Sequence, residues 1–211
     1  MGYKNRGYQR DVPLELVRDY KLFAIACEGS QREPQYFNIF QYMSNRIKVD
    51  LIEDYVKDDE LLSVSNTKSS PNWVLNRAMK YIEKNDLKDD DELWFVIDTD
   101  DWTSEQIRLL LDCCKDHENW NIVLSNPCFE IWLYFHKKAN IEITKSETCN
   151  QFKYEISTFD SGGYNKYRYI PLIDDAIRNS KNADSDIDSN LPNFKESLYN
   201  SIEYGSTDVS E

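Results

Sequence analysis

Short continuous runs of apolar residues occur along the chain, and each run ends in polar or acidic residues. They lie at residues 21–29, 93–97 and 121–126. Runs of this length, without alternation of apolar and polar positions, are typical of strands that are buried on both faces of a parallel sheet. The stretch from Val49 to Asn66 contains two further candidates, and we expect residues 61–64 to form the second strand of the sheet.

Apolar residues with helical spacing follow the predicted strands. The signals that begin helices are a proline or a capping residue in the first turn, and they lie at Pro34, Ser70–Pro71, Thr103 and Asn126–Pro127. Behind them, apolar residues recur every three or four positions and predict helices over residues 34–47, 71–82, 104–114 and 127–136. Strands that alternate with helices predict crossover connections, and therefore an α/β fold with a mostly parallel, Rossmann-like sheet flanked by helices.

The pattern weakens beyond about residue 140. We expect an N-terminal lead-in segment over residues 1–20, an α/β core over 21–140 and a helical C-terminal extension over 141–211. Amphipathic stretches in the extension predict helices at one end of the sheet, and they lie around residues 154–156, 167–177 and 194–202. Residues 182–190 and the last residues of the chain are acidic and rich in serine, which is typical of a flexible loop and a frayed tail.

The 211 residues carry a formal net charge of -13, with a pI near 4.7. This charge argues against a general, non-specific nucleic-acid binder, because such proteins present a basic face to the phosphates. A nucleic-acid substrate requires divalent metal ions or a basic partner subunit to offset the repulsion. The aromatic content of 13% provides enough packing material for a folded core.

No apolar stretch approaches the roughly 20 residues that are needed to span a bilayer, and the first residues lack the apolar run of a secretory signal. We therefore expect a cytoplasmic protein with no membrane partner. The five cysteines include no C-x-x-C pair, which argues against a structural zinc site and predicts reduced, mostly buried thiols. Two histidines are too few for a His-rich catalytic zinc site.

Acidic residues follow two of the predicted strands. Glu28 ends the first strand, and Asp98, Asp100 and Asp101 follow the strand at residues 93–97. In an open parallel sheet the carboxyl ends of the strands lie along one edge, so Glu28 and Asp98 meet if their strands are neighbours. Asp100 can point to the same side as Asp98, because side chains alternate along extended backbone. Carboxylates so near to one another need a compensating cation, and oxygen ligands favour Mg²⁺ or Mn²⁺.

An acidic turn after a strand also occurs in proteins without any metal site. Such turns are common as solvated loops, and Asp101 in particular can instead cap the helix that begins near Thr103. The joint placement of Glu28 after one strand and of Asp98 and Asp100 after another favours the metal site over a solvated loop.

Three segments resemble the motifs of one known family. C-E-G at residues 27–29, with E-P at 33–34 and Y-F at 36–37, matches its first motif, in which Arg32 stands where the family pattern has Thr. FVIDTDDW at residues 95–102 is similar to the second motif, and SNPCFEIWLYFH at residues 125–136 is similar to the third. On these residues the chain resembles the RloB-like proteins, a Toprim-fold group found with bacterial anti-phage defence genes.

The resemblance implies a Toprim-like fold and a metal-dependent endonuclease. In that class the glutamate at the end of the first strand acts as general acid or base, which gives Glu28 the proton-transfer role, while the D-x-D aspartates, here Asp98 and Asp100, hold Mg²⁺. We take Glu28, Asp98, Asp100 and Asp101 as candidate metal ligands. The family context also implies a partner ATPase of the ABC or AAA type that is encoded by a neighbouring gene, as in abortive-infection systems.

The motifs contain several second-tier candidates, of which Glu33 belongs to the first motif. Glu130 lies in the first turn of a predicted helix, where the helix dipole favours a carboxylate, so that capping competes with a role in the site. Ser125 and Asn126 either contact a phosphate at this helix start or only cap the helix. His136 lies in an apolar stripe and fits a satisfied, half-buried histidine better than a ligand.

A basic loop in the C-terminal extension offers a possible nucleic-acid contact. Residues 161–169, SGGYNKYRY, combine a pair of glycines with Lys166, Arg168 and tyrosines. This combination suits the clasping of a phosphate backbone, and it suits an ordinary basic surface loop equally well. The RloB-like pattern similarly has a lysine after a tyrosine here, which favours Lys166 over its neighbours.

Three functions are compatible with the sequence. The first is a Mg²⁺- or Mn²⁺-dependent nuclease that hydrolyses phosphodiester bonds of DNA or RNA as a defence effector. The second is a catalytically silent acidic module that docks a basic partner. The third is primase-like nucleotidyl transfer by the same carboxylates. A homo-oligomer is compatible with each of them.

Overall fold

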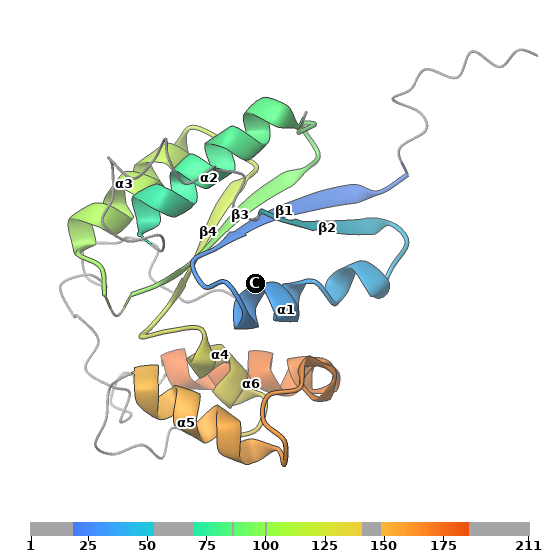
Figure 1. Cartoon of the computed structure of the whole chain (residues 1–211), viewed down its shortest axis with the longest axis vertical. Helices are drawn as coiled ribbons and strands as arrows, with labels where there is room; N and C mark the ends of the chain where they lie inside the picture. Colours follow the sequence, from blue (N-terminus) through green and yellow to red (C-terminus); the bar gives the residue numbers. More distant parts are fainter. Residues whose placement is uncertain (1–18, 53–69, 86, 100, 141–148, 186–211) are drawn as a thin grey trace, which may run out of the picture.

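The computed structural model describes residues 19–52, 70–85, 87–99, 101–140 and 149–185. Its centre is a sheet of four strands, β1 (Lys21–Cys27), β2 (Ile47–Leu51), β3 (Glu92–Asp98) and β4 (Trp120–Ser125), in the order β2-β1-β3-β4. Each strand runs parallel to its neighbours. Helices lie on both sides of the sheet (Figure 1), which confirms the predicted α/β class with a parallel sheet and a helical C-terminal part.

The second strand along the chain is β2, which overlaps the first of the two candidates in the stretch from Val49 to Asn66 and not the preferred one at residues 61–64. Those residues lie outside the described part of the chain. β2 lies at one edge of the sheet and pairs only with β1 among the described strands. Apolar and polar residues alternate along its sequence, IKVDL, because an edge strand is less completely buried than a central one. In a search for continuous apolar runs such a strand gives only a weak signal.

The first helix is shorter than its hydrophobic spacing predicted. α1 covers Arg32–Phe37 and is followed by a 3-10 turn, η2 (Phe40–Tyr42). The helix expected up to residue 47 was wrong in its second half, because Ile47 is the first residue of β2. Met43, which shares the helical spacing, is 59% exposed and packs on no core.

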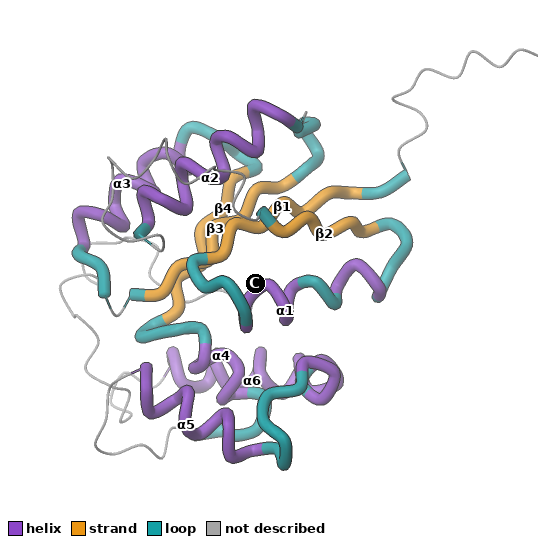
Figure 2. The backbone as a smooth tube through the Cα atoms, in the orientation of Figure 1, coloured by secondary structure: helices purple, strands orange, loops and turns teal. Residues whose placement is uncertain are grey.

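One face of the sheet is covered by α2 (Pro71–Lys84) and α3 (Ser104–Lys115), as Figure 2 shows. Both helices begin where the capping signals predicted. Oγ of Ser70 accepts a hydrogen bond from the backbone N–H of Trp73, and Thr103 forms a capping box with Gln106. The core on this side includes Ala24, Ala26, Val74, Ala78, Leu93, Phe95, Ile97, Ile107 and Leu110.

The opposite side of the sheet carries α1 and the helices that follow β4. These are α4 (Glu130–Phe135), α5 (Cys149–Phe159) and α6 (Ile173–Ser185), with the 3-10 turns η3 (Lys166–Arg168) and η4 (Ile170–Leu172) before α6. All residues of α4 are buried, because the helix packs against both α5 and α6. The C-terminal helices therefore form a layer below the sheet in the view of Figure 1.

Two predicted boundaries on this side were wrong. Asn126–Pro127 does not open α4, because residues 126–129 form the turn from β4 into a helix that begins at Glu130; the Asn126–Pro127 peptide bond is cis. Residues 182–185, expected in an acidic loop, are the end of α6. The rest of that loop, the amphipathic stretch at 194–202 and residues 1–18 of the lead-in lie outside the described residues.

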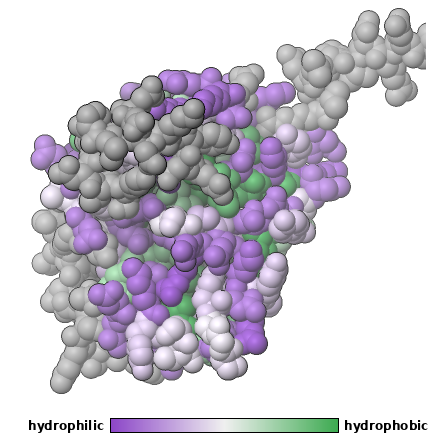
Figure 3. All heavy atoms as spheres, in the orientation of Figure 1, coloured by the Kyte–Doolittle hydropathy of each residue, from purple (hydrophilic) through white to green (hydrophobic). Residues whose placement is uncertain are grey.

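Charged residues make up 30% of the chain. The face seen in Figure 3 is mostly hydrophilic and is interrupted by patches of hydrophobic residues. None of the helices that the structure describes combines the length and the apolar character needed to cross a membrane.

Candidate active site

The carboxyl ends of β1 and β3 bring two acidic residues together. The two strands are neighbours, with Cys27 opposite Val96. The N–H of Glu28 donates to the carbonyl of Val96 at 2.9 Å, which extends the pairing by one residue beyond β1. Asp98 is the last residue of β3. Because parallel strands end along one edge of a sheet, the structure places Glu28 beside Asp98 at this edge.

Two donors hold the carboxylate of Glu28. Oε2 accepts a hydrogen bond from the backbone N–H of Asp98 at 3.0 Å. Oε1 accepts one from Nε1 of Trp102 at 2.9 Å. Trp102 is buried just before α3, and Glu28 itself is half-buried. The carboxylate is thus fixed by the protein and still partly accessible to solvent.

The carboxylate of Asp98 is oriented by the third motif segment. Its Oδ1 accepts a hydrogen bond from the backbone N–H of Phe129 at 2.9 Å. Phe129 directly precedes α4, so the bond links the end of β3 to the turn that follows β4. Asp98 is half-buried, like Glu28.

The other two aspartates of this turn differ from Asp98. Asp100 lies outside the described residues, and Asp101 is exposed. No group of three Cys, His, Asp or Glu ligand atoms within 4.8 Å of one another includes Glu28, Asp98 or Asp101 in the part of the chain that is described. Glu28 and Asp98 are therefore the pair that the structure brings together from the predicted cluster.

Glu33 lies in the first turn of α1, and its carboxylate rests on the loop after β1. A Cβ atom added to Gly29 would stand 2.1 Å from Oε1 of Glu33, so glycine leaves the room that this carboxylate occupies. Burial raises the pKa of Glu33; hydrogen bonds from the backbone at Glu33 and Gly29 oppose the rise, and the negative charge of Glu130 adds to it. Glu33 is therefore a buried acidic group close to the sheet edge.

Glu130 lies in the first turn of α4, as expected, and its carboxylate pairs with Arg32. Nη1 of Arg32 is 2.6 Å from Oε1 of Glu130, and the side chain of Glu130 is 6% exposed. Sequence reasoning assigned no role to Arg32, the residue that stands in place of Thr in the first motif. The guanidinium compensates a buried negative charge and ties α1 to α4.

The expectation that all cysteines are reduced was wrong. Cys128 and Cys149 form a disulfide that joins the turn before α4 to the first residue of α5. Cys27, Cys113 and Cys114 are free, and burial raises the pKa of the Cys114 thiol to about 12. A pairing across a sequence separation of 21 cannot be deduced from cysteine spacing alone.

The disulfide borders a group of potential ligands. Cys128, Glu130 and Cys149 are all buried, with their ligand atoms within 4.8 Å of one another. Sγ of Cys149 lies 3.5 Å from Oε2 of Glu130. Since both sulfurs are bonded to each other and Glu130 pairs with Arg32, we assign no metal to this group.

Ser125 and Asn126 are buried, and neither lies at the N-terminus of α4, which begins at Glu130. Oδ1 of Asn126 accepts a hydrogen bond from Oγ1 of Thr99 at 2.9 Å, which joins the two turns after β3 and β4. Ser125 lies opposite Asp98 in the β3–β4 register, and its Oγ has no hydrogen-bond partner among the described residues. Of the two, Ser125 is thus placed beside the carboxylate edge.

His136 is buried, and both of its ring nitrogens have partners. Nδ1 lies 2.9 Å from the carbonyl oxygen of Trp132, and Nε2 lies 3.1 Å from the hydroxyl of Tyr36. Burial lowers the pKa of His136 to about 4, so the ring is neutral at pH 7. These contacts fit a structural histidine that joins α4 to α1.

The basic loop with Lys166 and Arg168 lies against α1. A polar cavity is lined by residues 161–168 together with Gln35, which belongs to the same helix as Arg32 and Glu33. Nη1 of Arg168 binds Oδ1 of Asp160 at 3.2 Å, and Nζ of Lys166 lies 5.5 Å from the centre of the Tyr167 ring. Gly162 and Gly163 have φ values of 94° and 84°, which other residues rarely adopt. The glycine pair is therefore needed for this turn.

Sequence reasoning missed two residues that support the carboxylate edge. Trp102 belongs to the second motif, but nothing in its position indicated a bond to Glu28. Arg77 is buried in α2, and its guanidinium donates to the carbonyl of Cys27, the residue before Glu28. An arginine between Val74 and Ala78 on the apolar face of a predicted helix was the available signal, because a buried charge needs a specific partner.

The donor set at the edge fits a hard divalent cation. Mg²⁺ is usually bound through one or two protein carboxylates, with water and substrate phosphates as its remaining ligands. Glu28 and Asp98 supply carboxylate oxygens from two neighbouring strands, each oriented by a backbone N–H. Asp100 and Asp101 follow Asp98 in the sequence and are further candidates for this role.

Comparison with known proteins identifies one family. The family model described as RloB-like protein matches residues 23–211, a range that contains every candidate residue named above. No curated protein and no solved structure matches the chain.

Proposed function

The chain belongs to the RloB-like protein family, and from this membership and the paired carboxylates we propose that it is a metal-dependent Toprim nuclease. In this proposal it hydrolyses phosphodiester bonds of DNA or RNA with Mg²⁺ or Mn²⁺. The observation that carries the proposal is the bond between Oε2 of Glu28 and the N–H of Asp98, which joins the carboxyl ends of two neighbouring strands.

Each carboxylate has a separate role in the proposal. Asp98, with Asp100 and Asp101 of the same turn, holds the cation, and Glu28 lies beside it. A bound divalent cation stabilises negative charge on the phosphate and lowers the pKa of water. Glu28 transfers the proton as general acid or base. The N–H of Asp98 and Nε1 of Trp102 keep its carboxylate in one orientation during that transfer.

Positive groups near α1 are proposed to contact the nucleic-acid backbone. Lys166 and Arg168 project from the loop that packs against Gln35. Arg168 is half exposed in spite of its bond to Asp160, so the guanidinium can reach a phosphate without leaving its position. Such contacts position the backbone and carry no sequence information.

The net charge of -13 indicates that these few cations are not sufficient for binding by the chain alone. We therefore propose a partner that supplies positive charge or delivers the substrate. An ATPase of the ABC or AAA type, encoded beside this protein and acting with it in anti-phage defence, is the partner that family membership supports.

The proposal is tested with purified protein, alone and with its neighbouring ATPase, on DNA and on RNA in the presence of Mg²⁺ or Mn²⁺. We expect cleavage by the wild type, and loss of cleavage in Glu28→Gln and in Asp98→Asn. Asp112→Asn, an exposed carboxylate of α3 that pairs with Lys115, is the matched control and keeps full activity. Cleavage that survives both site variants contradicts the proposal.

An acidic module without catalysis is the second candidate, and the charge of -13 is the observation that favours it. Calorimetric titration with Mn²⁺ separates the two functions. The nuclease binds the cation, and binding weakens in Asp98→Asn but not in Asp112→Asn. A silent module that only docks a basic partner shows equal, non-specific Mn²⁺ binding in all three proteins.

A further inference from the structure

The sheet face that lies opposite α2 and α3 is only partly covered by the described residues. Two helices of three to four turns cover one face, whereas α1, with six residues, lies on the other. Phe23, Ile47 and Trp94 stay half-buried on this second face. Parallel sheets are normally buried on both faces, so the exposed apolar area needs a cover.

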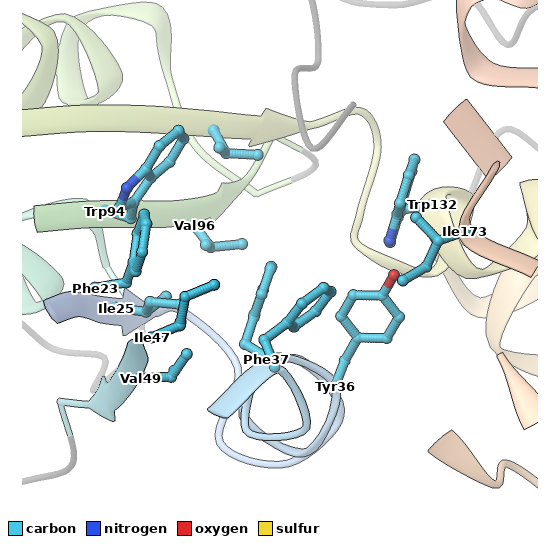
Figure 4. A pocket seen from close by; sticks show the side chains of 12 residues that line it. Phe23, Ile25, Tyr36, Phe37, Ile47, Val49, Trp94, Val96, Trp132 and Ile173 are labelled. Carbon is cyan, nitrogen blue, oxygen red and sulfur yellow. The ribbon is translucent and has the colours of Figure 1, made fainter. Parts of the chain in front are cut away.

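The uncovered area is a groove with apolar walls. Its volume is about 280 Å³, and side chains from all four strands form its floor. Figure 4 shows Phe23, Ile25, Ile47 and Trp94 on the strands, with Phe37 of α1 and Ile173 of α6 on the other side of the opening. A groove of this kind accepts the apolar stripe of an amphipathic helix.

We propose that residues 191–204 of the same chain dock in this groove. Leu191, Phe194, Leu198 and Ile202 recur every three or four positions, which is the spacing of one helix face. Pro192 stands at the first turn and Gly205 follows the stretch, and both are signals of helix ends. The aligned apolar residues match the apolar chemistry of the groove.

The connection from α6 allows this placement. Ile173, the first residue of α6, lines the groove, and α6 ends at Ser185. The 13 residues of α6 measure about 20 Å along the axis. Residues 186–190 reach up to about 17 Å when extended. The chain can therefore return along α6 to the groove, and the short tether favours this segment over a separate molecule through its high effective concentration.

The test places a photoreactive p-benzoylphenylalanine at position 198 of the full chain, and at position 200 as control. Leu198 lies on the apolar stripe, whereas Asn200 lies on the opposite face of the predicted helix. We expect crosslinks from position 198 to peptides of residues 21–27 or 92–98 within the same chain, several-fold more abundant than from position 200. Isotopically labelled and unlabelled chains are mixed, so that crosslinks between two copies are recognised by mass.

A second measurement does not depend on crosslinking. Leu198→Glu is expected to open the groove and to raise the fluorescence of the apolar dye ANS several-fold, while Asn200→Glu leaves it unchanged and both proteins keep their circular dichroism. Crosslinks between copies assign the groove to a second copy of the chain. If no crosslinks to either strand form and ANS binding does not change, the groove is covered by an outside partner or is open to solvent. Each of these results overturns the proposal.

Discussion

The backbone N–H of Asp98 donates to the carboxylate of Glu28 at 3.0 Å, so the main chain at the end of β3 positions the side chain that follows β1. The orientation of Glu28 therefore depends on the pairing of β1 with β3. A substitution that shifts the end of β3 is expected to displace Glu28 as well.

Trp102→Phe removes the second donor to Glu28 and keeps most of the aromatic packing. A hydrogen bond to a charged group contributes about 1.5–3 kcal/mol, so we expect the free energy of unfolding to fall by about 2 kcal/mol. The proposed cleavage activity is expected to fall too, because the carboxylate loses one of its two fixed contacts. Urea unfolding and the cleavage assay measure the two effects. Trp120→Phe is the control, since Trp120 stacks on His117 away from Glu28; equal losses in both variants contradict the prediction.

The ion pair between Arg32 and Glu130 is expected to be strongly coupled. Arg32→Met leaves a buried carboxylate without its counter-charge, and breaking such a pair costs about 3–5 kcal/mol when both groups are buried. Because the Arg32 side chain is 28% exposed, we expect a loss of about 2 kcal/mol. Arg32→Met with Glu130→Met removes both charges and is expected to be more stable than Arg32→Met alone.

The double-mutant cycle is measured by urea unfolding. The exposed pair of Lys115 and Asp112 provides the comparison, and its coupling is expected to stay below about 0.5 kcal/mol. Additive effects of the substitutions at Arg32 and Glu130 show that the two residues are not coupled.

Glu33 gives the protein a defined dependence on pH. Its pKa is raised mainly by burial, so the unfolded chain loses this proton at a lower pH than the folded protein does. The stability that protonated Glu33 contributes is complete below its usual pKa near 4.5 and is lost as the pH rises through the folded-state value. Glu33→Gln, which cannot ionise, is therefore expected to gain stability relative to the wild type between pH 4.5 and 7. Glu105→Gln, at an exposed position, is the control.

Most of the sheet and two of its helices could be predicted from the sequence. β1 and β3 appear as apolar runs because these central strands are largely buried, and the edge strand β4 carries an apolar run as well. α2 and α3 carry local capping signals that need no tertiary information. β2 was the less favoured of two candidates, because apolar and polar residues alternate along it and such a pattern is a weaker signal than a continuous apolar run. The end of α1 was missed because Ile47 fits the spacing of a helix and of a strand equally well.

Part of the candidate site could also be predicted from the sequence, and part could not. The pairing of Glu28 with Asp98 could be anticipated, because parallel strands end on one edge and the order of β1 and β3 was the single unknown. The hydrogen-bond and ion-pair partners of the carboxylates could not be anticipated. Trp102, Phe129 and Arg32 reach them through contacts between segments far apart in the chain, and no local pattern encodes such contacts.

His136 is expected to remain neutral far below the usual range of histidine. The Nδ1–H donates to the carbonyl of Trp132, so the neutral ring accepts at Nε2 from the hydroxyl of Tyr36, and a proton on Nε2 forces this hydroxyl to change from donor to acceptor. Burial lowers the pKa to about 4, compared with 6.5 in the unfolded chain. The stability that neutral His136 contributes is complete above pH 6.5 and is lost as the pH falls from 6.5 toward 4. The total loss in the free energy of unfolding is about 3 kcal/mol.

NMR titration of the imidazole signals measures the pKa of His136 directly, and His117→Asn removes the other histidine from the spectrum. We expect the His136 signal to show the Nδ1–H tautomer and to shift only near pH 4. Tyr36→Phe keeps the ring packing but removes the hydroxyl, and is expected to raise the pKa of His136, because the neutral ring then loses the hydrogen bond that it accepts at Nε2. A midpoint near 6.5 in the wild type shows that His136 is solvated and free to act in the site, which contradicts its structural assignment.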